Sequence, residues 1–157
     1  MRYVLPLLIA LSVAPLVSAQ SDDEGEEEPK SEVAIVFAGT YESESEKNFF
    51  TLGAEYEYRF IPKLGVSAAV EWVFESDTRE FVFVVPVVWH AVAGLRILAG
   101  PGLEREQDTS FLFRVGVNYA FEFGERYAII PALEVDFINE ESVTEAVVYG
   151  VNFGVSF

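Results

Sequence analysis

Apolar and polar positions alternate along most of the chain. The final stretch, AVVYGVNFGVSF, places a large apolar side chain at every second position up to Phe157, with mostly small or polar residues between them. NFFTLGAEYEYRF and SFLFRVGVNYAFEF follow the same rule over longer spans. Successive side chains of a β-strand point to opposite faces, so this period of two predicts strands with one apolar face and one small or polar face.

Eight such runs make up the body of the chain. They lie near residues 32–42, 48–60, 64–75, 80–90, 93–104, 110–123, 126–138 and 143–157. The joins between them are short, so consecutive runs are expected to pair as antiparallel hairpins. No run has a helical period, and closing the sheet removes both of its edges. The pattern therefore predicts an all-β, eight-stranded antiparallel up-and-down barrel.

The distribution of aromatic residues distinguishes a soluble barrel from a transmembrane one. Phe, Tyr and Trp crowd the apolar face from the second run onward, and eight strands enclose room only for their own side chains. The opposite face carries small and charged residues, which suit a narrow polar lumen. The apolar face is therefore expected to contact lipid, with aromatic girdles at two levels. One girdle is predicted to contain Tyr41, Phe49, Phe74, Phe81, Phe111 and Phe137, and the other Phe60, Trp89, Phe123, Tyr127 and Phe157.

The N-terminal segment differs from the rest of the chain. Residues 1–19 combine Arg2, an apolar run and the small residues Ser18 and Ala19, which is the pattern of a secretory signal peptide. Residues 20–31 are acidic and lack aromatics, which predicts a disordered leader. The barrel is therefore expected to span residues 32–157 and to be exported. It must hold together without disulfides, since the chain contains no cysteine.

Charge and motif content exclude several functions. With 26 acidic and 10 basic residues, the net charge is −16, whereas nucleic-acid phosphates require a basic surface. No glycine-rich phosphate loop and no metal-ligand spacing occurs, so we expect no cofactor and no metal centre. His90, the only histidine, stands beside Trp89 next to a predicted turn, which favours a turn or girdle role over that of a catalytic base. We therefore predict no enzymatic activity.

Residues 32–157 resemble the small outer-membrane β-barrels of Gram-negative bacteria, the OmpA transmembrane domain and OmpX type within the porin-like barrels. The resemblance rests on the signal peptide, the eight alternating runs and the terminal YGVNFGVSF. It implies location in the outer membrane, contact with its lipid and lipopolysaccharide, and both termini in the periplasm. It also implies that Phe157 belongs to the signal read by the barrel-assembly machinery. The outer joins are shorter than many in that family, which disfavours an adhesion or receptor role.

The polar face predicts a charged lumen. By parity and depth, the outer half holds Glu71, Arg114, Glu134 and Asp136, and the periplasmic half holds Glu57, Arg59, Arg96, Glu122 and His90. Buried charges are costly unless paired, and the turn near Gly124 sets Arg114 opposite or diagonal to Asp136 and Glu134. We therefore expect a charge network that plugs the barrel, formed by Glu57, Arg59, Glu71, Arg96, Arg114, Glu134 and Asp136.

The outer joins are strongly acidic. Such a rim suits divalent cations shared with lipopolysaccharide phosphates, and it equally suits the solubility of exposed loops. The expected function is an envelope-structural barrel with at most narrow passage of ions or small solutes. Two alternatives stay open. One is a transporter that releases small apolar molecules sideways into the bilayer, for which Val82, Val84 and Val88 beside Pro86 suggest a wall gap. The other is a lipid-modifying enzyme, which requires a histidine at the outer rim.

Overall fold

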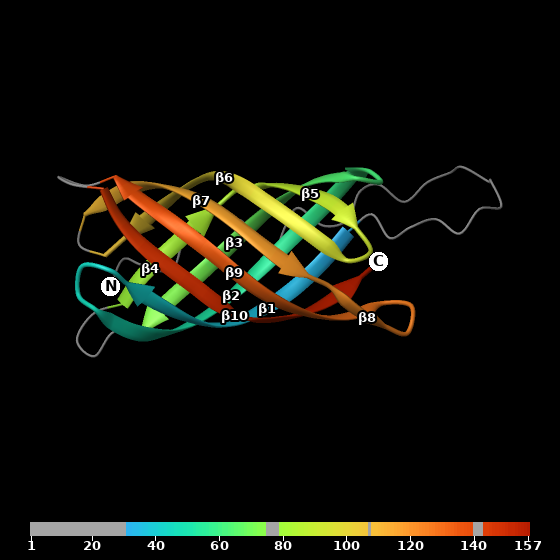
Figure 1. Ribbon diagram of the computed structural model, residues 1–157, viewed down its shortest axis with the longest axis horizontal. Helices are drawn as coiled ribbons and strands as arrows, with labels where there is room; N and C mark the ends of the chain where they lie inside the picture. The colour runs from blue at the N-terminus through green and yellow to red at the C-terminus, as the bar shows by residue number, and fades with distance from the viewer. Residues whose placement is uncertain (1–30, 75–78, 107, 140–142) are drawn as a thin grey trace, which may run out of the picture.

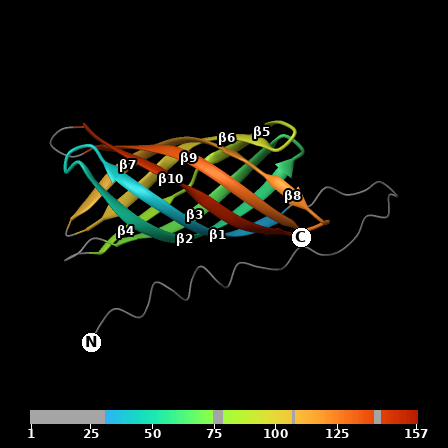
Figure 2. The same ribbon diagram turned by 60° about the horizontal axis from the view of Figure 1, so that its bottom comes forward.

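The computed structural model describes residues 31–74, 79–106, 108–139 and 143–157, and these form a closed antiparallel barrel (Figure 1, Figure 2). Its strands are β1 (Ser31–Glu42), β2 (Lys47–Ile61), β3 (Leu64–Phe74), β4 (Arg79–Val84), β5 (Val87–Val92), β6 (Leu95–Arg105), β7 (Thr109–Tyr119), β8 (Phe121–Phe123), β9 (Tyr127–Asn139) and β10 (Val143–Ser156). Long alternating runs of β-branched and aromatic residues favour this extended pairing. In the described part of the chain, no helix is long and apolar enough to cross a membrane.

The ten strand segments occupy eight positions in the wall. β4 and β5 both lie between β3 and β6, β7 and β8 both pair with β9, and β1 pairs with β10 to close the sheet. The predicted eight-stranded up-and-down barrel is therefore confirmed. β1 begins at Ser31, one residue before the predicted boundary. The predicted signal peptide and the rest of the predicted leader lie outside the described residues.

The wall stays closed where β4 gives way to β5. Pro86 lacks the N–H that a strand ladder uses, which interrupts the regular pairing. Even so, the Ser67 N–H donates to the Pro86 carbonyl at 2.9 Å, and the Val85 N–H donates to the Pro101 carbonyl at 2.9 Å. Pairing with β6 then resumes in the same register. The wall gap suggested by the sequence is therefore absent at this position.

The two ends of the barrel differ. At one end β1 starts beside the finish of β10: the Ser31 N–H donates to the Phe157 carbonyl at 3.2 Å, and the Phe157 N–H donates to the Ser31 carbonyl at 2.9 Å. We call this the terminal end, and it also carries the short turns at residues 62–63, 93–94 and 124–126. The opposite end, which we call the loop end, carries the connections that follow β1, β3, β6 and β9.

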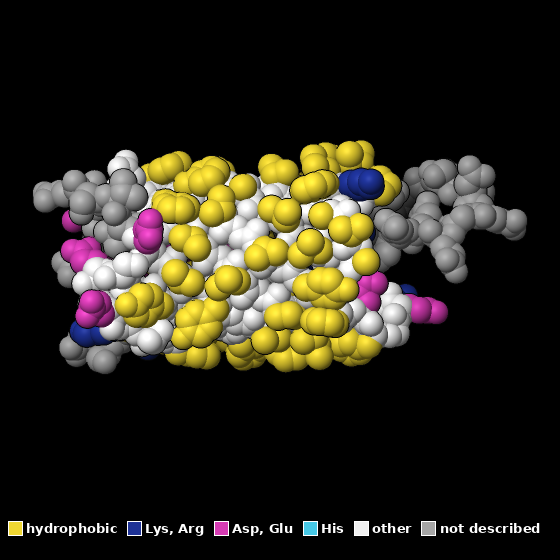
Figure 3. Space-filling model, in the orientation of Figure 1, with side chains coloured by type: hydrophobic (Ala, Val, Ile, Leu, Met, Phe, Trp, Pro, Cys, Tyr) yellow, Lys and Arg dark blue, Asp and Glu magenta, His cyan; other side chains and the backbone are white. Residues whose placement is uncertain are grey.

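The outer surface of the wall is apolar. Figure 3 shows hydrophobic side chains over the barrel and acidic side chains confined to its ends. Phe50 stacks on Phe74 near the loop end, and Phe123 stacks on Tyr127 near the terminal end. Phe49, which we predicted in a girdle, instead points inward and packs against the buried apolar residues of the lumen. Phe50 takes the outward position, and alternation then turns Phe49 to the other face.

Candidate functional site

Charged side chains fill the interior of the barrel. Alternation turns every second residue inward, and in the described part of the chain the inward positions hold buried acids and arginines. The buried charged residues are Glu32, Glu57, Glu71, Arg96, Arg114, Glu134 and Asp136. Their contacts divide them into two clusters, each built around one arginine.

The Arg114 cluster lies toward the loop end and joins Arg114 of β7 to Glu71 of β3 and to Glu134 and Asp136 of β9. The guanidinium donates to Asp136 from Nε and Nη2 at 2.6 and 2.7 Å, and to Glu71 from Nη1 and Nη2 at 2.5 and 2.8 Å. Its Nη1 also lies 2.8 Å from Glu134 Oε2. Arg114 is 2% exposed, so its planar set of donors is satisfied by carboxylates rather than by bulk water.

Strand register and a glycine create this geometry. Arg114 stands directly opposite Asp136 in the pairing of β7 with β9, whereas Glu71 reaches Arg114 from β3, a strand that is not its neighbour. Gly116 lies opposite Glu134, and a Cβ built on Gly116 comes within 2.6 Å of the Glu134 Cγ. The glycine therefore leaves the space that Glu134 needs beside Arg114.

The Arg96 cluster lies toward the terminal end and joins Arg96 of β6 to Glu32 of β1 and Glu57 of β2. Arg96 donates to the two oxygens of Glu32 at 2.6 and 3.0 Å and to Glu57 Oε2 at 3.2 Å. The His90 Nε2 of β5 lies 2.5 Å from Glu57 Oε1, and the Ser156 hydroxyl donates to Glu32 at 3.3 Å. This cluster therefore ties β1 and β10, where the chain ends meet, to the wall across the lumen.

The predicted network residues face the lumen, and all of them except Arg59 belong to one of the two clusters. The structure brings Arg114 together with Glu71, Glu134 and Asp136, and it brings Arg96 together with Glu57. Arg59 is half-buried on the same inward face of β2.

One placement at the terminal end was wrong and another was confirmed. Glu122 is exposed rather than inward, because β6 starts opposite Tyr119 and β8 pairs only with β9 beyond that point. His90 lies in the lumen as parity predicts, with its ring turned inward to Glu57, and this excludes the girdle alternative. Sequence analysis also left Glu32 and Glu55 out of the network. Alternation alone signals that both face inward, but Glu32 adjoins the leader, where the pattern begins.

Two cavities lie on either side of Arg114. A vestibule of about 160 Å³ opens at the loop end. Its acidic lining residues are Glu42, Glu44, Glu71, Glu80, Glu104, Glu106 and Asp136. On the other side, a mid-lumen cavity of about 10 Å³ is lined by Glu55, Glu134, Asn152 and apolar residues. Glu71 and Arg114 line both spaces, so their ion pair forms part of the partition between them.

The vestibule does not assemble a metal centre from the described side chains. Within residues 31–74, 79–106, 108–139 and 143–157, no group of three or more acidic or histidine side chains is arranged to hold a metal ion. Contact of the rim with divalent cations stays a prediction.

The paired charges in the lumen are suited to closing a narrow passage, because buried ion pairs resist separation.

Comparison with known proteins identifies the fold. No family model and no curated protein matches the chain. The crystal structure of Neisserial surface protein A aligns with a TM-score of 0.65 at 11% identity, over 81% of this chain and 96% of that one. Ail, the attachment invasion locus protein of Yersinia pestis, aligns with a TM-score of 0.58 at 16% identity, over 83% and 100%. This chain has the fold of the small outer-membrane β-barrels.

Further outer-membrane β-barrel structures agree with this fold. The N-terminal β-barrel domain of Pseudomonas aeruginosa OprF aligns with a TM-score of 0.57 at 14% identity, over 82% of this chain and 99% of that one. A structure from the de novo design of transmembrane beta-barrels aligns with a TM-score of 0.55 at 15% identity, over 83% and 100%. Natural and designed sequences therefore share the outer-membrane β-barrel fold, so function has to be argued from the lumen rather than from the wall.

Proposed function

We propose that this protein is an integral outer-membrane barrel with an envelope-structural role, whose lumen passes at most small ions. The apolar outer surface supports this location, since it needs a hydrocarbon environment. Closure of the sheet supports it too, because a bilayer leaves unpaired backbone groups without partners. In this proposal the terminal end faces the periplasm and the loop end faces the exterior.

The partition at Arg114 is the observation that carries the proposal. Arg114 is held by carboxylates from β3 and β9, and it separates the vestibule from the mid-lumen cavity. A solute that enters from the loop end must displace this guanidinium from its carboxylates. Separating buried charges in this way carries a penalty of several kcal/mol, so the closed arrangement is favoured.

The charge of the lumen favours cations over anions. Arg114 alone faces Glu71, Glu134 and Asp136, and further glutamates line the vestibule. An acidic wall lowers the potential of a narrow passage and concentrates cations at its mouth. Any ion that passes the partition is therefore proposed to be a small cation.

The C-terminus supports the proposed contact with the barrel-assembly machinery. The Phe157 side chain is 59% exposed, whereas its backbone pairs with Ser31 at the seam between β1 and β10. The ring is therefore accessible to a partner that handles the chain before the seam closes. Outer-membrane lipid around the apolar wall and lipopolysaccharide at the loop end complete the proposed surroundings.

The two alternative functions receive less support from the described residues. Lateral release needs an opening in the wall, yet backbone hydrogen bonds continue across Val85 and Pro86. Lipid modification needs a nucleophile beside a base. The His90 ring contacts Glu57 at the terminal end, and the buried Ser67 hydroxyl forms no hydrogen bond. The described residues therefore do not pair this histidine with a serine nucleophile.

Conductance in a planar lipid bilayer tests the proposal. We expect the refolded protein to show no discrete current steps, and we expect Arg114→Ala to open small, cation-selective steps because the partition is lost. Arg105→Ala is the matched control, since Arg105 is exposed at the end of β6 and its removal should leave the barrel closed. Current steps in the unmodified protein equal to those of Arg114→Ala, or anion selectivity of that variant, would contradict the proposal.

A further inference from the structure

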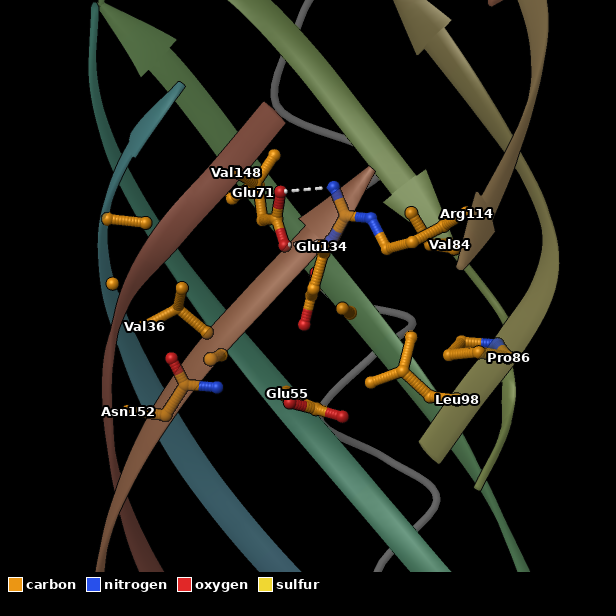
Figure 4. Close-up of a pocket in the computed structure, with 14 residues that line it drawn as sticks. Val36, Glu55, Glu71, Val84, Pro86, Leu98, Arg114, Glu134, Val148 and Asn152 are labelled. Atoms are coloured by element: carbon orange, nitrogen blue, oxygen red, sulfur yellow. Dashed lines mark hydrogen bonds and ion pairs between the residues drawn. The ribbon is translucent and has the colours of Figure 1, made fainter. Parts of the chain in front are cut away.

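The mid-lumen cavity borders the Arg114 cluster on the side away from the vestibule, and Glu71, Arg114 and Glu134 form part of its lining. Its volume of about 10 Å³ is close to the space that a single water-sized species occupies. Figure 4 shows Glu55 and Asn152 projecting into it below the Arg114 cluster, with Glu134 beside Arg114 at its upper side. Glu71 and Arg114, already paired with each other, also line it, and the rest of the lining is largely apolar, so the polar groups determine what this cavity binds.

Asn152 lacks a hydrogen-bond partner, and Glu55 lacks a positively charged partner, among the described residues. Asn152 is 3% exposed, and its side-chain amide forms no hydrogen bond with a described residue. Glu55 is half-buried beside the Ser67 hydroxyl, and it forms no ion pair within the described part of the chain, because Arg96 and Arg114 are occupied by other carboxylates. A buried polar group without a partner is costly, and an unpaired carboxylate is costlier still.

Glu134 adds to the excess of negative charge. Glu71 and Asp136 each receive two hydrogen bonds from Arg114, whereas Glu134 contacts the guanidinium only through Oε2. One positive charge therefore faces three carboxylates, and Glu55 supplies a fourth on the far side of the cavity. A small cation in this space would lie among oxygen ligands and offset part of the uncompensated charge.

We propose that the mid-lumen cavity binds one Na⁺ ion through oxygens of Glu55, Glu134 and Asn152. Carboxylate and amide oxygens are the ligands that hard cations prefer. A monovalent ion fits better than a divalent one, because no three acidic or histidine side chains of the described residues converge on a metal position. The cavity size excludes bulky organic cations. This proposal does not require the barrel to conduct, so it stands or falls separately from the closed-lumen function.

Stability at constant ionic strength tests the proposal. Urea unfolding of the refolded protein in detergent micelles is measured in NaCl and in the chloride of N-methyl-D-glucamine, a cation too large for the cavity. Above the Kd, we expect the folded-to-unfolded ratio to rise about tenfold for each tenfold rise in Na⁺. N-methyl-D-glucamine should give no such rise. Glu55→Gln should abolish the Na⁺ dependence, and Asn152→Ala should move it to higher Na⁺ concentrations.

Glu122→Gln provides the matched control, since it removes an exposed carboxylate at the terminal end and should keep the full Na⁺ dependence.

Three results would overturn the proposal. Equal stability in both salts, with Glu55→Gln more stable than the unmodified chain, would show that Glu55 is protonated and that the cavity holds no ion. A Na⁺ effect that survives Glu55→Gln would assign the ion to another site, such as the acidic rim. If Glu55→Gln does not fold, an unchanged Na⁺ response of Asn152→Ala would reject the proposed ligands.

Discussion

The Arg114 and Arg96 clusters use the same residue types but differ in burial and in charge balance. The Arg114 side chain is 2% exposed and faces three carboxylates. The Arg96 side chain is 5% exposed, while its partner Glu32 is 11% exposed and Glu57 is shared with His90. One cluster is thus a sealed partition with excess negative charge, whereas the other is a better balanced link near the mouth of the barrel.

This difference separates two uses of a buried ion pair. Near the terminal end, water reaches part of the cluster and a second basic group can compensate Glu57, so the Arg96 cluster mainly fastens strands together. The Arg114 cluster borders the vestibule, but no second basic side chain among the described residues contacts its carboxylates. Electrostatic energies rise as the local dielectric falls, so the same substitution should have unequal effects in the two clusters.

Arg114→Ala should give the largest loss of stability. We expect the free energy of unfolding to fall by about 3–5 kcal/mol, because Glu71, Glu134 and Asp136 lose the one cationic side chain that contacts them among the described residues. Urea unfolding in detergent micelles at neutral pH measures this loss. The loss should shrink at low pH, where protonation removes the charge of the orphaned carboxylates. Arg105→Ala, at an exposed position, should change stability by no more than about 0.5 kcal/mol. Unchanged stability of Arg114→Ala would remove the basis of the comparison.

Arg96→Ala should have a smaller effect. We expect a loss of about 1.5–3 kcal/mol in the same assay, because Glu57 keeps His90 and Glu32 keeps Ser156 as a partner. The two arginines share no carboxylate in the structure, so the double variant should show additive losses to within about 0.5 kcal/mol. If Arg96→Ala lost more stability than Arg114→Ala, the comparison would be reversed, and the Arg96 cluster would be the one that contributes more to the stability of the barrel.

The fold could be predicted because the apolar–polar alternation that indicates each strand lies within the residues of that strand. Each wall strand carries its own alternation, and short joins leave neighbouring strands only one way to pair. The errors occur where the pattern is interrupted or ends. The sequence around Pro86 left a wall gap open as an alternative, yet neighbouring carbonyls and N–H groups bridge the wall there. Alternation predicts Glu122 inward, but β8 continues the β7 run beyond Tyr119, where pairing with β6 ends. The point at which that pairing ends depends on strand register rather than on alternation.

The candidate site could be predicted only within neighbouring strands. Arg114 and Asp136 lie on adjacent wall strands, so counting from the turn places them opposite each other. Arg96 and Glu32 lie on β6 and β1 and meet across the lumen. Contacts across a barrel depend on strand tilt and stagger, which no single run of residues encodes. The mid-lumen cavity was not predicted, because its polar groups Glu55, Glu134 and Asn152 come from β2, β9 and β10, of which β2 pairs with neither of the other two.

Removal of Phe157 should have the smallest effect on the finished barrel, and it tests how firmly the Arg96 cluster holds the seam. Deletion removes the hydrogen bonds between Phe157 and Ser31, but the Ser156 hydroxyl still reaches Glu32 and Arg96 still holds Glu32. We therefore expect a loss of only about 1–2 kcal/mol in detergent unfolding assays.

Assembly in cells should respond more strongly than stability, because the family resemblance gives the terminal aromatic ring a role in recognition by the barrel-assembly machinery. Phe157→Ala separates the two effects, since it removes the exposed ring and keeps the backbone hydrogen bonds to Ser31. It should assemble as slowly as the deletion in cells and refold in detergent like the unmodified chain. Parallel losses of assembly and refolding in both variants would instead show that Phe157 closes the seam, and that the Arg96 cluster does not hold β1 against β10 without it.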